Sequence, residues 1–323
     1  MGFNVGVIGA GAFGSAISQQ LSKNLDEVIL LLRNENLCDD INSKGYNTKY
    51  YPNVKLNDNI RATLDISDLK DCDVIFLTIP SSAYRSTLDD LKKVLADDVI
   101  LVTTAKGIEY PSLKTMSKII AEYPFKNIVA LSGPNFASEI MLNLPSITNI
   151  ASSDIESSRR VKEILESKQF KVKIIDDMEG IELCGILKNI NAIANGICEG
   201  LNINENARFA VLTKGFNDTV RIIESVGGKS QTVREYCGFG DLILTATSKE
   251  SRNHTLGVLY GQRLIINENA SGIVFEGKNS IRAIKDICTE NAVESCIVDF
   301  VYDVIIEKVT PIQAFNKLWD KLE

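Results

Sequence analysis

The sequence predicts an α/β fold in which an N-terminal doubly wound parallel sheet is followed by a C-terminal all-helical domain. In the first half of the chain, short apolar runs alternate with helical patterns, which is typical of a parallel sheet covered by helices. After about residue 180, only helical patterns remain. Because 323 residues are enough for two domains, we expect a sheet domain at 1–180 and a helical domain at 181–323.

Several segments of the first half have the composition of buried strands. Each is short, rich in valine, isoleucine and leucine, and bounded by glycine, proline or polar residues. They are residues 3–9, 27–33, 72–80, 99–107, 127–133, 146–152 and 170–176. The segments of the second half that are predicted to be helical are 180–201, 205–227, 231–238 and 280–307.

The overall composition argues against several classes of protein. The net charge is −7, whereas non-specific nucleic-acid binders are usually basic. The longest apolar runs are too short to span a bilayer, and no signal-peptide pattern is present at the N-terminus. The chain has a single histidine, His254, whereas a catalytic zinc site usually takes two or three. We therefore expect no metal. Seven cysteines without a CxxC pair are typical of free thiols, so we expect a cytoplasmic protein.

Gly9, Gly11 and Gly14 have the GxGxxG spacing between the first predicted strand and the first predicted helix. Glycines at these positions allow a tight turn and a close approach of the backbone to a pyrophosphate. The helix that follows offers free N–H groups and the positive end of its dipole. The motif alone is weak, because an ordinary glycine-rich turn has the same letters. Its place at the first strand of an alternating chain favours dinucleotide binding.

The residues after the second predicted strand bear on the choice of dinucleotide. A site specific for NAD often has an acidic residue there, which binds the ribose 2′-hydroxyl. Here the strand is followed by Arg33 and Asn34, and an arginine can pair with a 2′-phosphate. The sequence therefore favours NADP(H) without excluding NAD(H). The alternative is that Arg33 is a solvated loop residue.

Three polar stretches follow predicted strands or begin a predicted helix. Lys106 follows a strand, where open α/β sheets bind ligands; the alternative is a surface lysine. Residues 133–135 follow another strand, and Asn135 is a natural N-cap for the next helix, so plain turn chemistry is the alternative. Residues 251–253 gather a serine, an arginine and an asparagine at a predicted helix start, which can form a phosphate site; the alternative is an ordinary polar cap.

The predicted helix around Lys188 is otherwise built mostly from small and apolar residues, and no acid lies one helical turn away. Lys188, Asn191 and Asn195 fall on one stripe of that helix, and Asp241 stands at the edge of a later apolar run. A lysine in a cleft can give a proton to a carbonyl oxygen or take one back, and a carboxylate can orient it. The alternatives are a snorkelling lysine and a helix-capping aspartate.

Taken together, these stretches resemble the bacterial NAD(P)+-dependent glycerol-3-phosphate dehydrogenases over essentially the whole chain. The matching stretches are GAGAFG, NTKYYPNVKLNDNI, KGIE, SGPNFA, GIELCGILKNINAIANGICEGL, NARFAVLTKG, GFGDLILTATSKESRN and FEG. The KN pair followed by GDL and SRN is highly specific for this family. The resemblance implies a Rossmann domain joined to an all-α domain, usually in a homodimer. It also implies that dihydroxyacetone phosphate and sn-glycerol 3-phosphate are interconverted with NAD(P)(H), which supplies phospholipid synthesis.

The resemblance also implies roles for individual residues. Lys188 matches the catalytic lysine, which accepts the proton in the oxidative direction, and its supporting polar groups are Asn189, Asp241 and Thr245. Substrate contacts are implied for Lys106, Gly133, Asn135, Lys188, Asp241, Ser251, Arg252 and Asn253. Cofactor contacts are implied for Gly9, Gly11, Ala12, Phe13, Gly14, Arg33, Lys106, Ala137, Arg252, Val274 and Glu276.

Some positions depart from the family pattern. Ala12 stands where many relatives have serine, and Asn135 replaces the common serine or threonine. Ser138 stands where a charged residue is frequent, and Cys184 replaces a small glycine or alanine. None of these departures removes a proposed catalytic group.

Two competing functions remain open at this point. A dehydrogenase acting on a non-phosphorylated hydroxy acid would share the fold but would not need the phosphate site at 251–253. A non-catalytic dinucleotide sensor would keep the glycine motif but could discard Lys188 and Asp241, and both are present.

Overall fold

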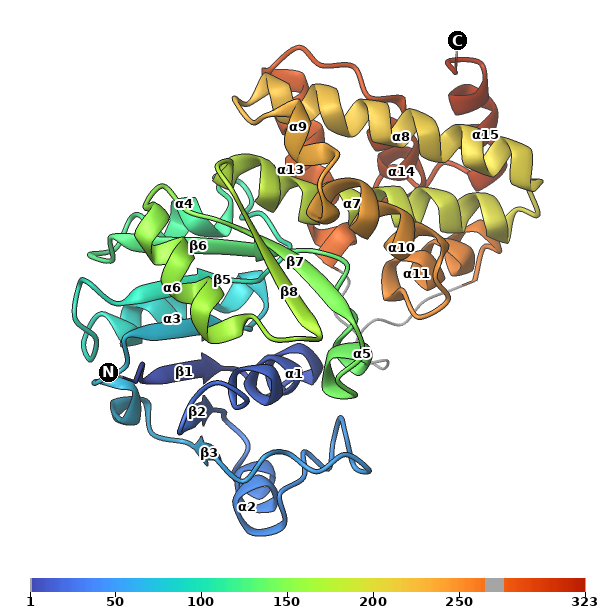
Figure 1. The fold of residues 1–323 in the computed structure, drawn as a ribbon. Coiled ribbons are helices and arrows are strands. Elements are labelled where there is room, and N and C mark those ends of the chain that lie inside the picture. The colour runs from blue at the N-terminus through green and yellow to red at the C-terminus, as the bar shows by residue number, and fades with distance from the viewer. Residues whose placement is uncertain (1, 265–275, 323) are drawn as a thin grey trace. The chain divides into compact units, whose positions relative to one another are not determined.

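The computed structural model describes residues 2–264 and 276–322, and the chain divides into two compact units (Figure 1). The first comprises Met1–Ala105 and Met116–Met178 and contains the sheet. The second comprises Lys106–Thr115 and Glu179–Glu323 and is built of helices. Residues 106–115 therefore group with the helical unit, which the strand–helix pattern did not indicate. The ends of this segment pair through an isolated antiparallel bridge between Ile108 and Thr115.

The first unit contains one eight-stranded sheet with the order β3-β2-β1-β4-β5-β6-β7-β8. Its strands are β1 (Val5–Ile8), β2 (Val28–Leu31), β3 (Ile60–Thr63), β4 (Val74–Leu77), β5 (Ile100–Thr103), β6 (Asn127–Ser132), β7 (Ser146–Ala151) and β8 (Phe170–Ile175). Every strand predicted from the apolar runs is present. The strand order reverses beside β1, as in a doubly wound dinucleotide-binding sheet, so the predicted fold class is confirmed.

The sheet is parallel except at one place, where β7 runs antiparallel to β6. The prediction of a wholly parallel sheet was therefore wrong at this pair. Parallel neighbours need a crossover, usually a helix that carries the chain back along the sheet. The link between β6 and β7 holds only the five-residue helix α5 (Ala137–Met141), so the chain returns in the opposite direction.

Strand β3 was not predicted. Its sequence is IRAT, and it lies at the edge of the sheet, where it pairs only with β2. Arg61 is half-buried and bonds to carboxylates, so the segment has no apolar run of the kind that revealed the other strands.

Helices cover both faces of the sheet, as the apolar strands required. The helices of this unit, besides α5 and two short 3-10 turns, are α1 (Ala12–Leu21), α2 (Glu35–Lys44), α3 (Tyr84–Leu91), α4 (Met116–Ile120) and α6 (Ile155–Leu165). Alternate side chains of β4 join two separate apolar clusters. Val74 and Phe76 pack with residues of α1 and α6, whereas Ile75 and Leu77 pack with residues of α3 and α4.

The second unit has no strand among its described residues after 178. Its helices are α7 (Met178–Gly200), α8 (Glu205–Ser225), α9 (Ser230–Val233), α10 (Asp241–Thr247), α11 (Arg252–Gly261), α13 (Glu276–Glu290), α14 (Cys296–Ile305) and α15 (Pro311–Trp319), with a π-helical turn at Tyr236–Gly240. The predicted helical stretch 280–307 is two helices. The chain turns at Ala292, which has a positive φ of 52°, and the Ser295 side chain caps α14 by accepting from the Val298 amide.

Helices α7 and α11 touch backbone to backbone through glycines. A Cβ atom on Gly196 would lie 2.1 Å from the carbonyl oxygen of His254, and one on Gly257 would lie 2.2 Å from that of Ile193. Gly200 and Gly261 repeat this contact one turn further along both helices. Only glycine allows such an approach, so the GxxxG spacing on each helix fixes where α11 crosses α7.

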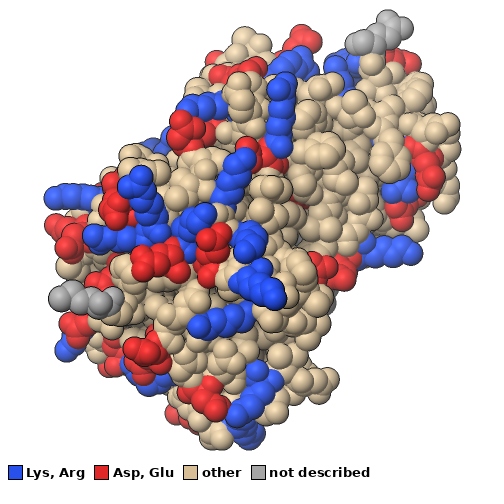
Figure 2. All heavy atoms as spheres, in the orientation of Figure 1, with Lys and Arg blue, Asp and Glu red and all other residues tan. Residues whose placement is uncertain are grey.

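All seven cysteines are buried with free thiols, as the sequence indicated. Within the described parts of the chain, no helix combines the length and the apolar character needed to cross a membrane. On the face drawn in Figure 2, basic and acidic side chains are interspersed.

Candidate functional site

The glycine loop after β1 has the geometry that a dinucleotide requires. Gly9 has a φ of +108°, which favours glycine, and a Cβ on Gly14 would lie 1.8 Å from the carbonyl oxygen of Gly9. A Cβ on Gly11, in contrast, would meet no protein atom within 4 Å. Gly9 and Gly14 are thus required by the fold, whereas Gly11 faces open space. The absence of a side chain at Gly11 leaves room for the close approach of a ligand.

The carbonyl oxygens of this loop are held by side chains from elsewhere in the unit. The Thr78 hydroxyl donates to the carbonyls of Ile8 and Gly9, at 2.8 and 2.9 Å. The Asn47 amide donates to the carbonyl of Ala10 at 3.0 Å, and the Tyr51 hydroxyl donates to that of Ala12 at 3.1 Å. Burial raises the pKa of Tyr51 to about 12, so this donor keeps its proton. No role was predicted for these three residues, because single polar residues in a loop carry no periodic signal.

The N-terminus of α1 is open to an anion. Its N-cap is Gly11, no side chain caps its N–H groups, and its first turn contains no acidic residue. Ala12 and Phe13, both predicted to contact the cofactor, are the first two residues of this helix. Phe13 and Ala137, the first residue of α5, are half-buried against the same apolar cluster. The residues present therefore fit a pyrophosphate on the free amides of α1.

Arg33 and Asn34 follow β2, as predicted, but only one of them is engaged. The Asn34 side chain caps α2 by accepting from the Leu37 amide at 2.8 Å. Arg33 is exposed and makes no ion pair within the described residues. Its guanidinium is therefore available to a ligand phosphate. Two other predicted cofactor contacts are not placed: Val274 lies outside the described residues, and for Glu276 only its place at the start of α13 is described.

The turn after β6 differs from its prediction. The N-cap of α5 is Phe136, so the expected capping role of Asn135 was wrong. Its amide nitrogen instead donates to the carbonyl of Ile147, at 3.0 Å, because the chain returns beside it in β7. Its buried Oδ1 atom has no partner in the described protein. A Cβ on Gly133 would lie 2.9 Å from both this oxygen and the backbone of Thr148, so the turn requires glycine.

In the helical unit, four of the predicted residues form one polar cluster. Lys188, in α7, places Nζ 2.5 Å from Oδ1 of Asp241 and 3.0 Å from the hydroxyl of Thr245. Asp241 and Thr245 lie one turn apart on α10, and the Thr245 hydroxyl donates to the same carboxylate oxygen at 3.1 Å. Lys106 approaches the other oxygen, Oδ2, at 3.5 Å. Asp241 thus binds two lysines. The alternative, that Asp241 caps a helix, is wrong, because the N-cap of α10 is Gly240.

Lys188 and Asp241 are buried, whereas Lys106 is partly exposed. Lys188 is 6% exposed and Asp241 is 1% exposed, whereas the Lys106 side chain retains 23% of its accessible surface. Burial lowers the pKa of Lys188 to about 7; the Asp241 carboxylate opposes this shift and the nearby Lys106 adds to it. A lysine with such a pKa can both donate and accept a proton near neutral pH. The snorkelling alternative is wrong, because the ammonium group itself is buried.

The other polar residues around Lys188 in α7 are used differently. Asn189 is buried beside it in the sequence, but the hydrogen bonds of Lys188 go to Asp241 and Thr245. Asn191 donates to the hydroxyl of Thr219 in α8, and Asn195 accepts from Arg208 at 2.9 Å. The stripe of asparagines seen in the sequence therefore joins α7 to α8 and does not extend the lysine site.

Residues 251–253 form the start of α11, as predicted. Ser251 is the N-cap, and its hydroxyl accepts from the amide of His254 at 3.2 Å. Arg252 is exposed and has no ion-pair partner within the described residues. Asn253 has a buried Oδ1 atom with no partner in the same residues. The helix start thus combines an available guanidinium with the positive end of the α11 dipole, and Asn253 adds a side-chain amide whose N–H groups can donate.

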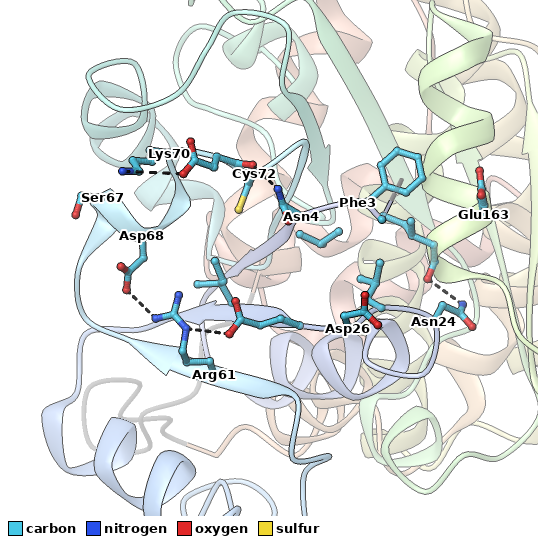
Figure 3. A pocket seen from close by; sticks show the side chains of 17 residues that line it. Phe3, Asn4, Asn24, Asp26, Arg61, Ser67, Asp68, Lys70, Cys72 and Glu163 are labelled. Carbon is cyan, nitrogen blue, oxygen red and sulfur yellow. Dashed lines mark hydrogen bonds and ion pairs between the residues drawn. The ribbon is translucent and has the colours of Figure 1, made fainter.

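A cavity of about 870 Å³ in the sheet unit lies elsewhere (Figure 3). Its lining includes Asn4 and Glu27, which directly precede β1 and β2, and Cys72, which lies two residues before β4. It therefore opens at the amino ends of β1, β2 and β4, whereas open parallel sheets bind dinucleotides at the carboxyl ends. Its arginine, Arg61, is already paired with Glu27 and Asp68 (Figure 3). We therefore do not assign the cofactor to this cavity.

In comparisons with known proteins, both halves of the chain match the same enzyme family. The family model for the N-terminus of NAD-dependent glycerol-3-phosphate dehydrogenase matches residues 4–158, and the model for its C-terminus matches residues 177–316. The glycerol-3-phosphate dehydrogenase (NAD(P)+) of Methanothermobacter thermautotrophicus is 39% identical over 94% of this chain and 93% of that protein. The enzyme of the same name from Halothermothrix orenii is 35% identical over 98% and 95%.

A solved structure agrees with these sequence matches. The crystal structure of glycerol-3-phosphate dehydrogenase from Coxiella burnetii superposes with a TM-score of 0.93 at 29% identity, and 99% of each chain is covered. The matched regions include the glycine loop, the Lys188–Asp241 cluster and the start of α11. The chain therefore belongs to the NAD(P)+-dependent glycerol-3-phosphate dehydrogenase family.

Proposed function

We propose that Lys188 is the proton donor with which this dehydrogenase reduces dihydroxyacetone phosphate to sn-glycerol 3-phosphate. The observation that carries the proposal is the buried Lys188 ammonium group, held at 2.5 Å by Asp241 and at 3.0 Å by Thr245. A carbonyl oxygen that receives a hydride on its carbon develops negative charge, and a nearby ammonium group stabilises this charge and then protonates it. In the reverse direction, neutral Lys188 accepts the proton of the hydroxyl group.

The neighbours of Lys188 each supply one part of this step. Asp241 fixes the position of the amine and raises its pKa against the effect of burial. Thr245 gives Lys188 a second hydrogen-bond partner and is itself bonded to Asp241, so the amine has a defined direction. Lys106, partly exposed on the other carboxylate oxygen, adds positive charge that favours an anionic substrate. We assign Asn189, which is buried beside Lys188, to the support of this group.

The substrate phosphate is assigned to the start of α11. Arg252 offers parallel donors, the NH2 group of Asn253 offers further donors, and the helix end offers free N–H groups. The geometry of Ser251 supports a capping role, in which it holds the first turn of the helix while the two residues after it contact the phosphate. Gly133 and Asn135 are assigned further substrate contacts, and the unpartnered Oδ1 of Asn135 accepts a substrate hydroxyl.

The dinucleotide supplies the hydride when it is bound. We assign its pyrophosphate to the loop of Gly9, Gly11 and Gly14 with the amides of Ala12 and Phe13, and further contacts to Lys106, Ala137, Arg252, Val274 and Glu276. We assign an adenosine 2′-phosphate, where the dinucleotide carries one, to Arg33. This assignment favours NADP(H) and still permits NAD(H).

One assay tests the proposed function. Purified protein is given NADH or NADPH with dihydroxyacetone phosphate, and in parallel with dihydroxyacetone. We expect cofactor oxidation to depend on the substrate phosphate, with kcat/KM at least about tenfold higher for dihydroxyacetone phosphate, as expected for loss of a charge-assisted hydrogen bond. Equal turnover of the two ketones would exclude the phosphate site and favour a dehydrogenase of another substrate class.

We also infer a cytoplasmic homodimer that supplies glycerol 3-phosphate for phospholipid synthesis. The family resemblance supports this inference, and half-exposed aromatic side chains of the helical unit offer an apolar contact surface. Phe239 packs edge-on against Phe216 of α8, and 52% of its surface remains accessible. Light scattering of the purified protein tests the dimer, and a monomer at micromolar concentration would contradict it.

A further inference from the structure

His254, the only histidine of the chain, directly follows Arg252 and Asn253, which we propose to bind the substrate phosphate. It is 3% exposed, and its Nε2 atom lies 3.2 Å from Oε2 of Glu199 in α7. Its carbonyl oxygen lies against Gly196, also in α7, where a Cβ would come within 2.1 Å. His254 thus holds α11 to α7 twice, through its ring and through its backbone.

The carboxylate that receives His254 is itself held in place. Glu199 pairs with Nη2 of Arg208, in α8, at 2.5 Å, and Nε of Arg208 donates to Asn195 in α7 at 2.9 Å. Asn195, Arg208, Glu199 and His254 therefore form a chain of bonds that joins three helices. This chain ends one residue away from Asn253 and two residues away from Arg252.

We propose that His254 is a positioning residue that fixes Arg252 and Asn253 at a set place relative to α7, the helix that carries Lys188. The inference rests on the proposed function, because it takes Arg252 and Asn253 to bind the substrate phosphate. When the phosphate is held at a set place relative to Lys188, the carbonyl oxygen of the same substrate is already oriented toward the proton donor. The glycine contacts set the distance between α7 and α11, and the His254–Glu199 bond sets the orientation of the first turn.

The environment of His254 suits a neutral donor. Burial lowers the pKa of His254 below its ordinary value; Glu199 opposes this shift and Arg208 adds to it. A neutral imidazole protonated on Nε2 donates to Glu199, and the carboxylate keeps its pairing with Arg208. A glutamine at this position can also present an N–H donor, whereas phenylalanine fills a similar volume without one.

The test compares His254→Phe with His254→Gln on dihydroxyacetone phosphate and dihydroxyacetone. We expect His254→Phe to raise KM for dihydroxyacetone phosphate about tenfold and to lower the selectivity for the phosphorylated ketone. A hydrogen bond to a charged group supports an effect of this size. His254→Gln should restore most of the selectivity. Thermal unfolding of each variant reports whether the fold is retained.

Two further variants separate the possible outcomes. Glu199→Ala should lower selectivity in the same way, and the part of its effect that comes from the His254–Glu199 bond should not add to that of His254→Phe, because both variants remove this bond. As a matched control, Lys317→Met removes an interhelical ion pair between α15 and α14, at 2.8 Å from Asp303, and should leave selectivity unchanged.

Arg252→Ala, measured beside these variants, tells the two proposals apart. If Arg252→Ala leaves selectivity for the phosphorylated ketone intact, the assignment of the phosphate site is wrong. If Arg252→Ala abolishes selectivity while folded His254→Phe keeps it, only the positioning role of His254 is overturned. Equal losses on both ketones in His254→Phe, or no recovery in His254→Gln, would also overturn that role.

Discussion

Lys188 and Asp241 lie 53 positions apart in the sequence, yet Nζ of the lysine is 2.5 Å from Oδ1 of the aspartate in the buried interior of the helical unit. The pair is not self-contained, since the second oxygen of Asp241 faces Lys106 at 3.5 Å. One carboxylate therefore serves two ammonium groups. An ammonium group held in this way can stabilise an anionic substrate and a developing alkoxide, which is the role that we propose for Lys188.

The first prediction concerns the proton donor. Lys188→Ala should lower kcat for reduction of dihydroxyacetone phosphate by at least ~10²-fold, the lower end of general-acid effects, while the affinity for the dinucleotide changes little. Steady-state kinetics, with dinucleotide binding followed by fluorescence, measure both quantities. Lys162, which is half-exposed on α6 and lies 3.5 Å from Glu166, offers a matched control. Lys162→Ala should behave as wild type, and near-normal turnover in folded Lys188→Ala would refute the assignment.

The second prediction concerns pH. Because the pKa of Lys188 is lowered to about 7, its protonated form, needed for reduction, is lost as the pH rises through 7. The value of kcat/KM for reduction should therefore fall above about pH 7, whereas that for oxidation of glycerol 3-phosphate should fall below it. Initial rates in both directions between pH 5 and 9 measure this dependence. If kcat/KM fell on the same side of pH 7 in both directions, a group other than Lys188 would control the proton transfer.

The third prediction follows from the part of Asp241 in that pKa. Its carboxylate raises the pKa of Lys188 against the effect of burial. Asp241→Asn should therefore move the limb of the reduction profile to lower pH, besides lowering kcat. Thr245→Val removes a neutral partner of the same lysine and should lower kcat with a smaller displacement of the limb. An unmoved limb in Asp241→Asn would mean that Asp241 acts on structure alone.

The fourth prediction separates the glycines of the nucleotide loop. Gly14→Ala should destabilise the sheet unit by about 1–3 kcal/mol, because its Cβ would lie 1.8 Å from the carbonyl oxygen of Gly9. Gly11→Ala should leave the fold intact, since its Cβ meets no protein atom, and should weaken dinucleotide binding. Thermal unfolding and dinucleotide titration distinguish the two variants. Full dinucleotide affinity in Gly11→Ala would place the pyrophosphate elsewhere.

The sequence predicted those features that follow from local patterns. Apolar runs revealed all strands except β3, whose half-exposed Arg61 breaks the pattern, and the GxGxxG spacing revealed the nucleotide loop. Sequence alone did not reveal how Thr78, Asn47 and Tyr51 hold that loop, because their partners are distant backbone carbonyls. The capping role expected for Asn135 was wrong for the same reason, since β7 supplies a carbonyl that no local pattern shows.

The last prediction concerns the choice between the two dinucleotides. Arg33 is exposed just after β2, has no ion pair within the described residues, and stands where NAD-specific sites often have an acid. Arg33→Ala should raise the KM for NADPH by at least about tenfold, because a charge-assisted hydrogen bond is worth about 1.5–3 kcal/mol. The KM for NADH should change little, since NADH has no 2′-phosphate. The matched control is Lys44→Ala. It removes another exposed cation, which is already paired with Asp40 at 2.6 Å, and it should change the KM of neither dinucleotide. Equal loss for both dinucleotides, or none for either, would make Arg33 a loop residue without a part in cofactor selection.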